Sequence, residues 1–178
     1  MRWFWIDRFV EFESGRKAVA LKNISLVEEQ MDGYLPGMAI MPSSLIIEGL
    51  AQAGGLLIGE CGQFQERVVL AKITRAKFHL LARAGETLRY TVELDDIRPG
   101  GAICKGTSHL DDRVQAEMEL VFAFLDQRFV DDLFHPAELL RWLRLLRLYE
   151  VGRDAQGERL SVPPRLRDAE LAELSDAE

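Results

Sequence analysis

Alternation of hydrophobic and polar residues dominates the middle of the chain. Between Thr87 and Leu94 every second side chain is apolar, and the same alternation recurs at even positions from 114 to 124. A period of two residues predicts strands with one face toward a core. This alternation and the turn residues between the segments predict strands at Arg8–Glu13, Lys17–Ser25, Val68–Phe78, Thr87–Leu94, Ala102–Leu110 and Val114–Phe124.

A helical pattern precedes most of these strands. The segment Glu28–Met41 contains several breakers of regular structure and is predicted to be a loop. After Pro42 a pair of serines can cap a helix, and Leu45–Ile58 is apolar on nearly all sides, which is typical of an enclosed helix. An enclosed helix among antiparallel strands predicts an α+β fold in which a sheet wraps around the helix.

The last quarter of the chain has a different character. Pro136–Tyr149 is predicted to be a helix that could lie on a membrane surface, although packing across the sheet or against a second chain is the preferred interpretation. Its apolar side comprises Leu139, Leu140, Trp142, Leu143 and Leu146, and its arginines, spaced by three, are Arg141, Arg144 and Arg147. The tail from Gly152 is polar and interrupted by prolines, and is predicted to be loosely ordered. These changes predict one domain over residues 1–125 and an extension over residues 126–178.

Charge narrows the range of functions. With 22 basic and 29 acidic residues the net charge is −7, which argues against general nucleic-acid binding. The segment Ala71–Gly85 is nevertheless free of acidic residues and carries Lys72, Arg75, Lys77 and Arg83. Such a patch can attract an acidic partner protein, or it can be the solvated face of a strand.

Compartment and cofactors are suggested only by weak signals. Cys61 and Cys104 have no metal-like spacing and fit a reducing compartment. The N-terminus lacks the pattern of a signal peptide, and the longest apolar run, Ala39–Ile58, contains Glu48, a proline and three glycines. We therefore expect a soluble, cytoplasmic protein with no metal and no redox cofactor.

Glu48 is the unusual residue of the predicted helix. It is the only ionisable side chain between Tyr34 and Ile58, and an enclosed carboxylate must be protonated or paired. At helical spacing it shares one stripe with Gln52, Gly55 and Gly59, so a carboxyl and an amide adjoin two positions at which a ligand can approach the backbone. The alternative is a structural carboxyl bonded to a loop.

The stretch around Glu48 resembles the signature of the beta-hydroxyacyl-acyl-carrier-protein dehydratases, Gly-His-Phe-Pro-Gly-His-Pro-x-Met-Pro-Gly-x-Leu-x-x-Glu-Ala-x-Ala-Gln. The matching residues at identical spacing are Gly33, Pro36, Gly37, Met41, Pro42, Leu45, Glu48, Ala51 and Gln52. Weaker similarity extends from about residue 3 to residue 125. The resemblance implies a hotdog fold, in which a sheet wraps around a long helix and two chains pair to form a continuous sheet.

The resemblance also implies roles for particular residues. Family members carry a histidine base on the loop and an acid on the helix of the other chain, and helix-start amides polarise the thioester carbonyl. By position the acid is Glu48, the amide belongs to Ser43, Gln52 supports the acid, and Tyr34 stands where the family has its histidine. Gly37, Met41 and Phe78 are the further expected substrate contacts, and Lys72, Arg75 and Lys77 the expected carrier-docking residues.

Tyr34 makes the activity the open question. A phenol has a pKa of about 10 and is a poor base at neutral pH, and losing a general base typically costs about 100–10,000-fold in rate. The other reading of Tyr34 is an aromatic that fills the lost pocket; His79, His109 and His135 lie outside the motif. Three functions remain. The first is a 3-hydroxyacyl-thioester dehydratase of acyl-chain metabolism. The second is a non-catalytic subunit that binds acyl-carrier-protein or coenzyme A thioesters and lends Glu48 to a histidine-bearing partner, and the third is a thioesterase in which Glu48 activates water. The expected assembly is a homodimer or a higher homo-oligomer, and the mixed pair with a paralogous partner belongs to the second of these functions.

Overall fold

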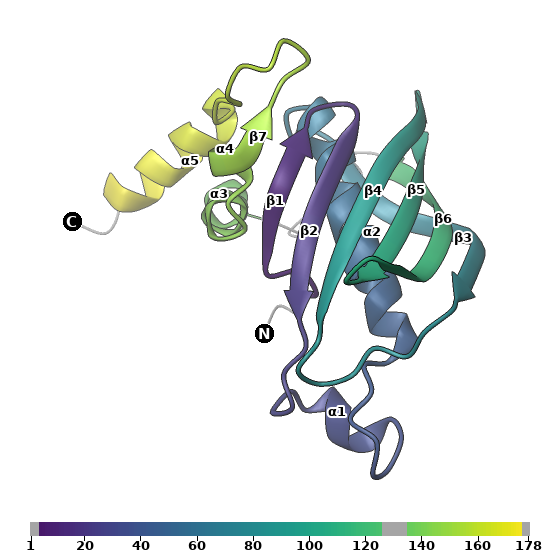
Figure 1. The fold of residues 1–178 in the computed structure, drawn as a ribbon. Coiled ribbons are helices and arrows are strands. Elements are labelled where there is room, and N and C mark those ends of the chain that lie inside the picture. Colours follow the sequence, from purple (N-terminus) through teal and green to yellow (C-terminus); the bar gives the residue numbers. More distant parts are fainter. Residues whose placement is uncertain (1–3, 126–134, 176–178) are drawn as a thin grey trace.

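One seven-stranded sheet organises the chain, in the order β3-β6-β5-β4-β2-β1-β7. The computed structural model describes residues 4–125 and 135–175. Neighbouring strands are antiparallel except for β1 and β7, which are parallel. The strands are β1 (Arg8–Glu13), β2 (Lys17–Asn23), β3 (Arg67–Phe78), β4 (Thr87–Arg98), β5 (Gly101–Leu110), β6 (Arg113–Leu125) and β7 (Gly152–Arg153). They curve around the helix α2 (Ser43–Cys61), so the predicted α+β architecture is confirmed (Figure 1).

The predicted strands are all present, with shifts at their ends. The β1 strand has the predicted bounds, whereas β4 continues past Leu94 to Arg98 through a bulge opposite β5. The predicted loop contains a short helix, α1 (Gln30–Gly33), in which Met31 is buried. Its single turn was too short to produce a helical pattern in the sequence.

A second bulge changes which residues of β6 face the core. The register between β5 and β6 shifts where His109 pairs with Val114 and Ser108 pairs with Ala116. Because two residues then oppose one, Gln115 is buried and Val114 is 37% exposed, so the expected inward position of Val114 is wrong. The Gln115 side chain is accommodated because its Nε2 donates to the Leu80 carbonyl oxygen at 2.8 Å.

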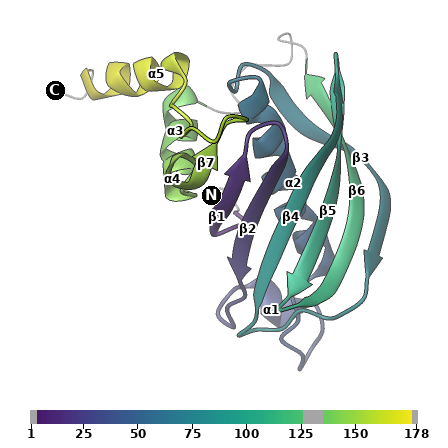
Figure 2. The ribbon, with the colours of Figure 1, turned by 45° about the horizontal axis from the view of Figure 1, so that its top comes forward.

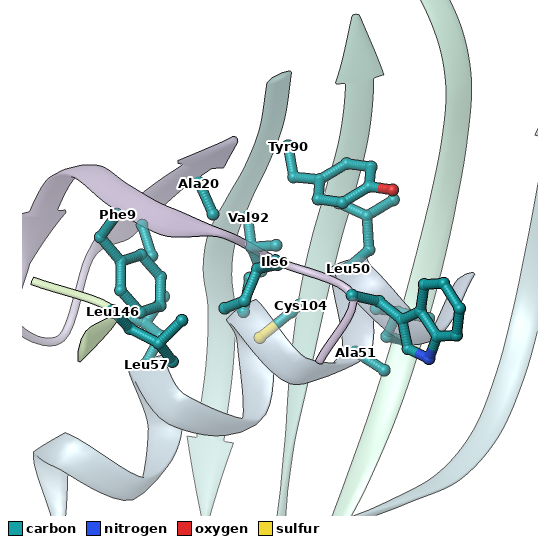
Figure 3. Close-up of a cluster of buried hydrophobic side chains, with 14 of the residues drawn as sticks. Ile6, Phe9, Ala20, Leu50, Ala51, Leu57, Tyr90, Val92, Cys104 and Leu146 are labelled. Atoms are coloured by element: carbon teal, nitrogen blue, oxygen red, sulfur yellow. The ribbon is translucent and has the colours of Figure 1, made fainter. Parts of the chain in front are cut away.

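The core lies between α2 and the concave face of the sheet. Small residues on α2 allow the strands to come close: a Cβ on Gly49 would lie 2.4 Å from the Tyr90 ring. Tyr90, Leu50 and Leu57 are each fully buried, and Figure 3 shows their side chains in the cluster where strand and helix meet. This packing fixes the rotation of α2 about its axis and therefore the direction in which its polar residues point.

By length and composition alone, α2 is long and apolar enough to cross a membrane. Half of that window is buried within the protein, as in the core helix of a soluble fold. Its apolar character is therefore explained by the sheet on one side and, as shown below, by a cleft on the other.

The C-terminal part is more ordered than predicted. Its helices are α3 (Pro136–Leu145), α4 (Leu148–Val151) and α5 (Pro164–Ser175), and the single predicted helix is divided because Arg147 has a φ of +60°. The tail is not loose, since Gly152 pairs with β1 and Leu166 is buried. The expected domain boundary at residue 126 lies outside the described residues.

The arginines of α3 explain how α5 is held. Arg141 donates to Glu173 at 2.6 Å, and Arg144 pairs with Glu170. The basic face of α3 therefore contacts the chain's own last helix, and the membrane-surface interpretation is not needed. Figures 1 and 2 show these helices beside β1, at the end of the sheet opposite β3.

Candidate active site

Glu48 lies on the side of α2 that faces away from the sheet. Its side chain is exposed, so the prediction of an enclosed carboxylate is wrong for the single chain. The reason is that α2 is covered by the sheet along one side only, and the side that carries Glu48 borders an open cleft. The stripe of Glu48, Gln52, Gly55 and Gly59 predicted from helical spacing does share this cleft.

A chain of hydrogen bonds orients the Glu48 carboxyl. Gln52, one turn later, donates from Nε2 to Glu48 Oε1 at 3.0 Å. The Gln52 Oε1 in turn accepts from the backbone N–H of Trp5 at 2.9 Å. Since the amide is held at both ends, it fixes one oxygen of a carboxyl that belongs to the lining of the cleft. The structure therefore places the Gln52 amide between the Glu48 carboxyl and the Trp5 backbone.

The cleft has a volume of about 1180 Å³ and is mainly apolar. One wall is α2, with Glu48, Ala51, Gln52, Gly55, Leu56 and Gly59. The opposite wall belongs to the C-terminal helices, with Leu139, Trp142, Leu143 and Leu146. The start of β3, from Arg67 to Leu70, closes a third side. A carboxyl at the edge of an apolar cleft suits a ligand with one polar end and a hydrocarbon tail.

The beginning of α2 provides backbone donors. Helix hydrogen bonding starts with Leu45 N–H donating to the Pro42 carbonyl oxygen at 3.0 Å. The amide of Ser43 precedes that bond, as the first N–H groups of any helix do, and is available to a ligand. No serine side chain caps the helix, because Pro42 is the N-cap and makes no side-chain bond.

Tyr34 is separated from this cleft within one chain. It follows α1, is 48% exposed and is absent from the cleft lining, so it does not fill a pocket as one reading proposed. Gly37, at a φ of +79°, and Met38 border a different, smaller cavity of about 240 Å³. Met41 is buried, with its N–H bonded to the Ala82 carbonyl oxygen. The structure therefore brings Glu48 and Gln52 together but leaves Tyr34 and Gly37 elsewhere on the same chain.

The predicted docking residues lie on the edge strand. Lys72, Arg75 and Lys77 on β3 are all exposed, and Phe78 at its end is half-buried. The adjacent strand opposes them with acids, since Arg75 pairs with Glu119 and Lys77 with Glu117. The patch is therefore less basic than its segment of sequence suggested.

The three histidines make other contacts. His79 lies 2.9 Å from Glu117, and this hydrogen bond is the main reason why the pKa of Glu117 is lowered. His135 pairs with Glu173 at 2.7 Å, and His109 lies opposite Arg89 on β4. Among the described residues no histidine lines the cleft, and no group of three or more acids, histidines or cysteines is placed to hold a metal.

Sequence reasoning missed the C-terminal wall. Trp142 stacks near Phe4 with ring centroids 4.3 Å apart, and both rings line the cleft. The apolar stripe of the predicted helix was the available signal, but nothing in the sequence indicated which surface it would cover.

Comparison with known proteins identifies the family of the chain. A family model described as a FabA-like domain matches residues 3–123. A 3-hydroxyacyl-(acyl-carrier-protein) dehydratase FabZ of Symbiobacterium thermophilum is 39% identical over 122 residues, covering 68% of this chain and 86% of the relative. The enzyme of the same name from Pelotomaculum thermopropionicum is 38% identical over 119 residues, covering 66% of this chain and 85% of the relative.

Solved structures show the same fold at low sequence identity. The dehydratase heterocomplex ApeI:P of Xenorhabdus doucetiae has a TM-score of 0.59 at 14% identity, covering 78% of this chain and 88% of the other. A Streptococcus mutans protein bound to acetyl-CoA has a TM-score of 0.56 at 15% identity, covering 70% and 93%. The sheet wrapped around α2 is thus a hotdog fold.

Proposed function

We propose, since this chain belongs to the FabA-like family, that it binds 3-hydroxyacyl thioesters and supplies Glu48 as the acid of a dehydration site. The observation that carries the proposal is the Glu48–Gln52–Trp5 hydrogen-bond chain at the edge of an apolar cleft. The clear resemblance to 3-hydroxyacyl-(acyl-carrier-protein) dehydratases supports the substrate class.

The reaction needs one base and one acid. The base removes the proton from the carbon beside the thioester carbonyl, and the carbon–oxygen bond at the next carbon breaks as Glu48 donates its proton to the departing hydroxyl. An enoyl thioester and water result, and the proton on the base returns to the carboxylate of Glu48 through solvent. The amide of Ser43 stabilises negative charge on the carbonyl oxygen during proton removal. Gln52 keeps the Glu48 carboxyl directed at the leaving group.

The base has to come from another chain. Tyr34, at the position of the family's histidine, is not part of the cleft that holds Glu48 in the same chain. In a homodimer the second chain would present only a phenol, so dehydration by this protein alone is slow. We therefore propose a site shared between chains, in which a histidine-bearing partner completes what this chain begins. The phenol of Tyr34 at the position of the family's histidine is the observation that favours the mixed pair over the homodimer.

The carrier and compartment follow from the same proposal. An acyl carrier protein is acidic, and the exposed Lys72, Arg75 and Lys77 on β3 are its proposed docking residues, with Phe78, the last residue of that strand, as a proposed substrate contact. Acyl-chain synthesis and two free cysteines, Cys61 and Cys104, favour the cytoplasm. The hotdog part is proposed to cover residues 1–125.

Four proteins test the acid assignment: the natural chain, Tyr34→His, Tyr34→His with Glu48→Gln, and Tyr34→His with Glu60→Gln. Hydration of crotonyl thioester is followed by loss of enoyl absorbance. We expect slow turnover by the natural chain and an increase of about 100-fold or more on Tyr34→His, the usual contribution of a general base. Glu48→Gln should abolish that increase. Glu60→Gln is the matched control, because Glu60 is on the same helix but outside the cleft lining.

Two results would contradict the proposal. If Tyr34→His turns over substrate equally well with and without Glu48→Gln, Glu48 is not the acid. If the natural chain instead releases free thiol from acyl thioesters, and Glu48→Gln stops this release, the protein is a thioesterase. For the mixed pair, a histidine-bearing family member should become more active on addition of the natural chain but not of its Glu48→Gln variant.

A further inference from the structure

We infer that the C-terminal helices form a wall of the acyl cleft and determine the length of acyl chain that it accepts. The inference rests on the proposed function, because the occupant is the hydrocarbon tail of the thioester. Its basis is that Leu139, Trp142 and Leu143 of α3 line the same cleft as Glu48. The family match ends at residue 123, before these helices begin, so this wall is an addition to the part shared with the relatives.

The wall is firmly attached to the rest of the protein. The Phe9 N–H donates to the Leu146 carbonyl oxygen at 2.8 Å, and β7 extends the sheet beyond β1. Arg165, at the start of α5, donates to the Phe64 carbonyl oxygen at 3.1 Å, and Leu140 is fully buried. An element held by the sheet, by buried leucines and by hydrogen bonds can act as a rigid boundary.

The shape and chemistry of the cleft favour a tail of limited length. Polar lining residues lie along the whole of α2: Glu48 and Gln52 in its first half, and near its end Arg165, which donates to Phe64, whose own N–H donates to the Gly59 carbonyl oxygen. Along α2 the distance from Glu48 to Gly59 is about 16 Å at the usual rise per residue. The surfaces between these ends are apolar on both walls, so methylene groups gain by burial there but not beyond the charged end.

Leu139 offers a direct test, because a larger residue there would shorten the cleft. Leu139→Trp places a bulky ring on the lining wall, whereas Leu145→Trp makes the same change on the same helix at a position that is 64% exposed and outside the lining. Trp142→Ala enlarges the cleft. Calorimetry would measure the binding of pantetheine thioesters with butyryl, octanoyl, dodecanoyl and hexadecanoyl tails. Thermal melting would give the unfolding temperature of each variant, and light scattering its molar mass.

We expect Leu139→Trp to lower the affinity for the longest tail that the natural protein binds by about tenfold or more, which is the effect of two methylene groups losing their burial. The affinity for the butyryl thioester should be unchanged. Trp142→Ala should extend the preference to longer tails, and Leu145→Trp should match the natural protein. An equal loss at all tail lengths, or no change at any, would overturn the inference. So would a change in molar mass confined to Leu139→Trp, because a second chain would then occupy the cleft. If the natural protein binds no acyl thioester of any length, the proposed function itself fails.

Discussion

Gly49 should be the least replaceable glycine of α2. It follows Glu48 directly and packs against β4, where a Cβ would lie 2.4 Å from the Tyr90 ring and 2.8 Å from the Trp5 carbonyl oxygen. Tyr90 is fully buried and Trp5 belongs to the hydrogen-bond chain of the site. Gly49→Ala therefore forces either α2 or the residues around it to move. Gly55→Ala is the matched control, because its nearest neighbour would be Phe122 at 3.8 Å, an ordinary contact.

The two substitutions should have opposite effects on the free energy of unfolding. Alanine in a helix interior is favoured over glycine by about 1 kcal/mol, and this gain applies to both positions. Overpacking a core typically costs about 1–3 kcal/mol. The cost of Gly49→Ala should lie at the upper end of this range, because both a backbone carbonyl and an aromatic ring obstruct the added methyl group. We expect Gly49→Ala to lose about 2 kcal/mol and Gly55→Ala to gain about 0.5–1 kcal/mol.

Thermal and urea unfolding, followed by circular dichroism at one fixed protein concentration, measure both values. For a chain of this size the melting temperature should fall by about 4–8 °C for Gly49→Ala and rise by about 1–4 °C for Gly55→Ala. Equal stabilisation by both would refute the reasoning. It would mean that α2 is rotated from the position described, and the direction of Glu48 would then be wrong as well.

Three further predictions concern groups outside the cleft. Burial raises the pKa of Glu60, so the contribution of this residue to stability is greatest at acid pH and is lost as the pH rises through the raised pKa. At neutral pH, Glu60→Gln should therefore unfold at a higher temperature than the natural chain. If this difference in unfolding temperature does not shrink on acidification, the prediction is wrong. The hydrogen bond from Arg141 lowers the pKa of Glu173, so this attachment of α5 is complete at a pH above the ordinary pKa of a carboxyl and weakens as the pH falls through the lowered pKa. Amide hydrogen exchange in α5 should accelerate over that acid range, and it should accelerate less in Glu173→Gln. Gln115→Leu should cost about 1–3 kcal/mol in urea unfolding, since it removes the donor to the Leu80 carbonyl oxygen, and an unchanged midpoint would show that this bond is not needed.

Local sequence determined the elements of the fold and their order. The alternation in Thr87–Leu94 predicted β4, because a period of two residues buries one face of a strand. The apolar run Leu45–Ile58 predicted α2, because a run of this length fits a helix with apolar surroundings. Spacing along α2 also placed Glu48 and Gln52 on a common face, since helical geometry is independent of what surrounds it. That common face is the one that borders the cleft.

Tertiary structure decided what those faces meet. An apolar helix signals only that its sides avoid water, and the sequence could not distinguish sheet from cleft, so the burial of Glu48 was wrongly predicted. The bulge that turns Val114 outward depends on how two strands align, and the ordering of α5 depends on pairs such as Arg144 with Glu170, far apart in the chain. Local pattern specifies which surfaces are apolar or charged, whereas long-range packing chooses their partners, and that choice makes Trp142 a wall of the cleft beside Glu48.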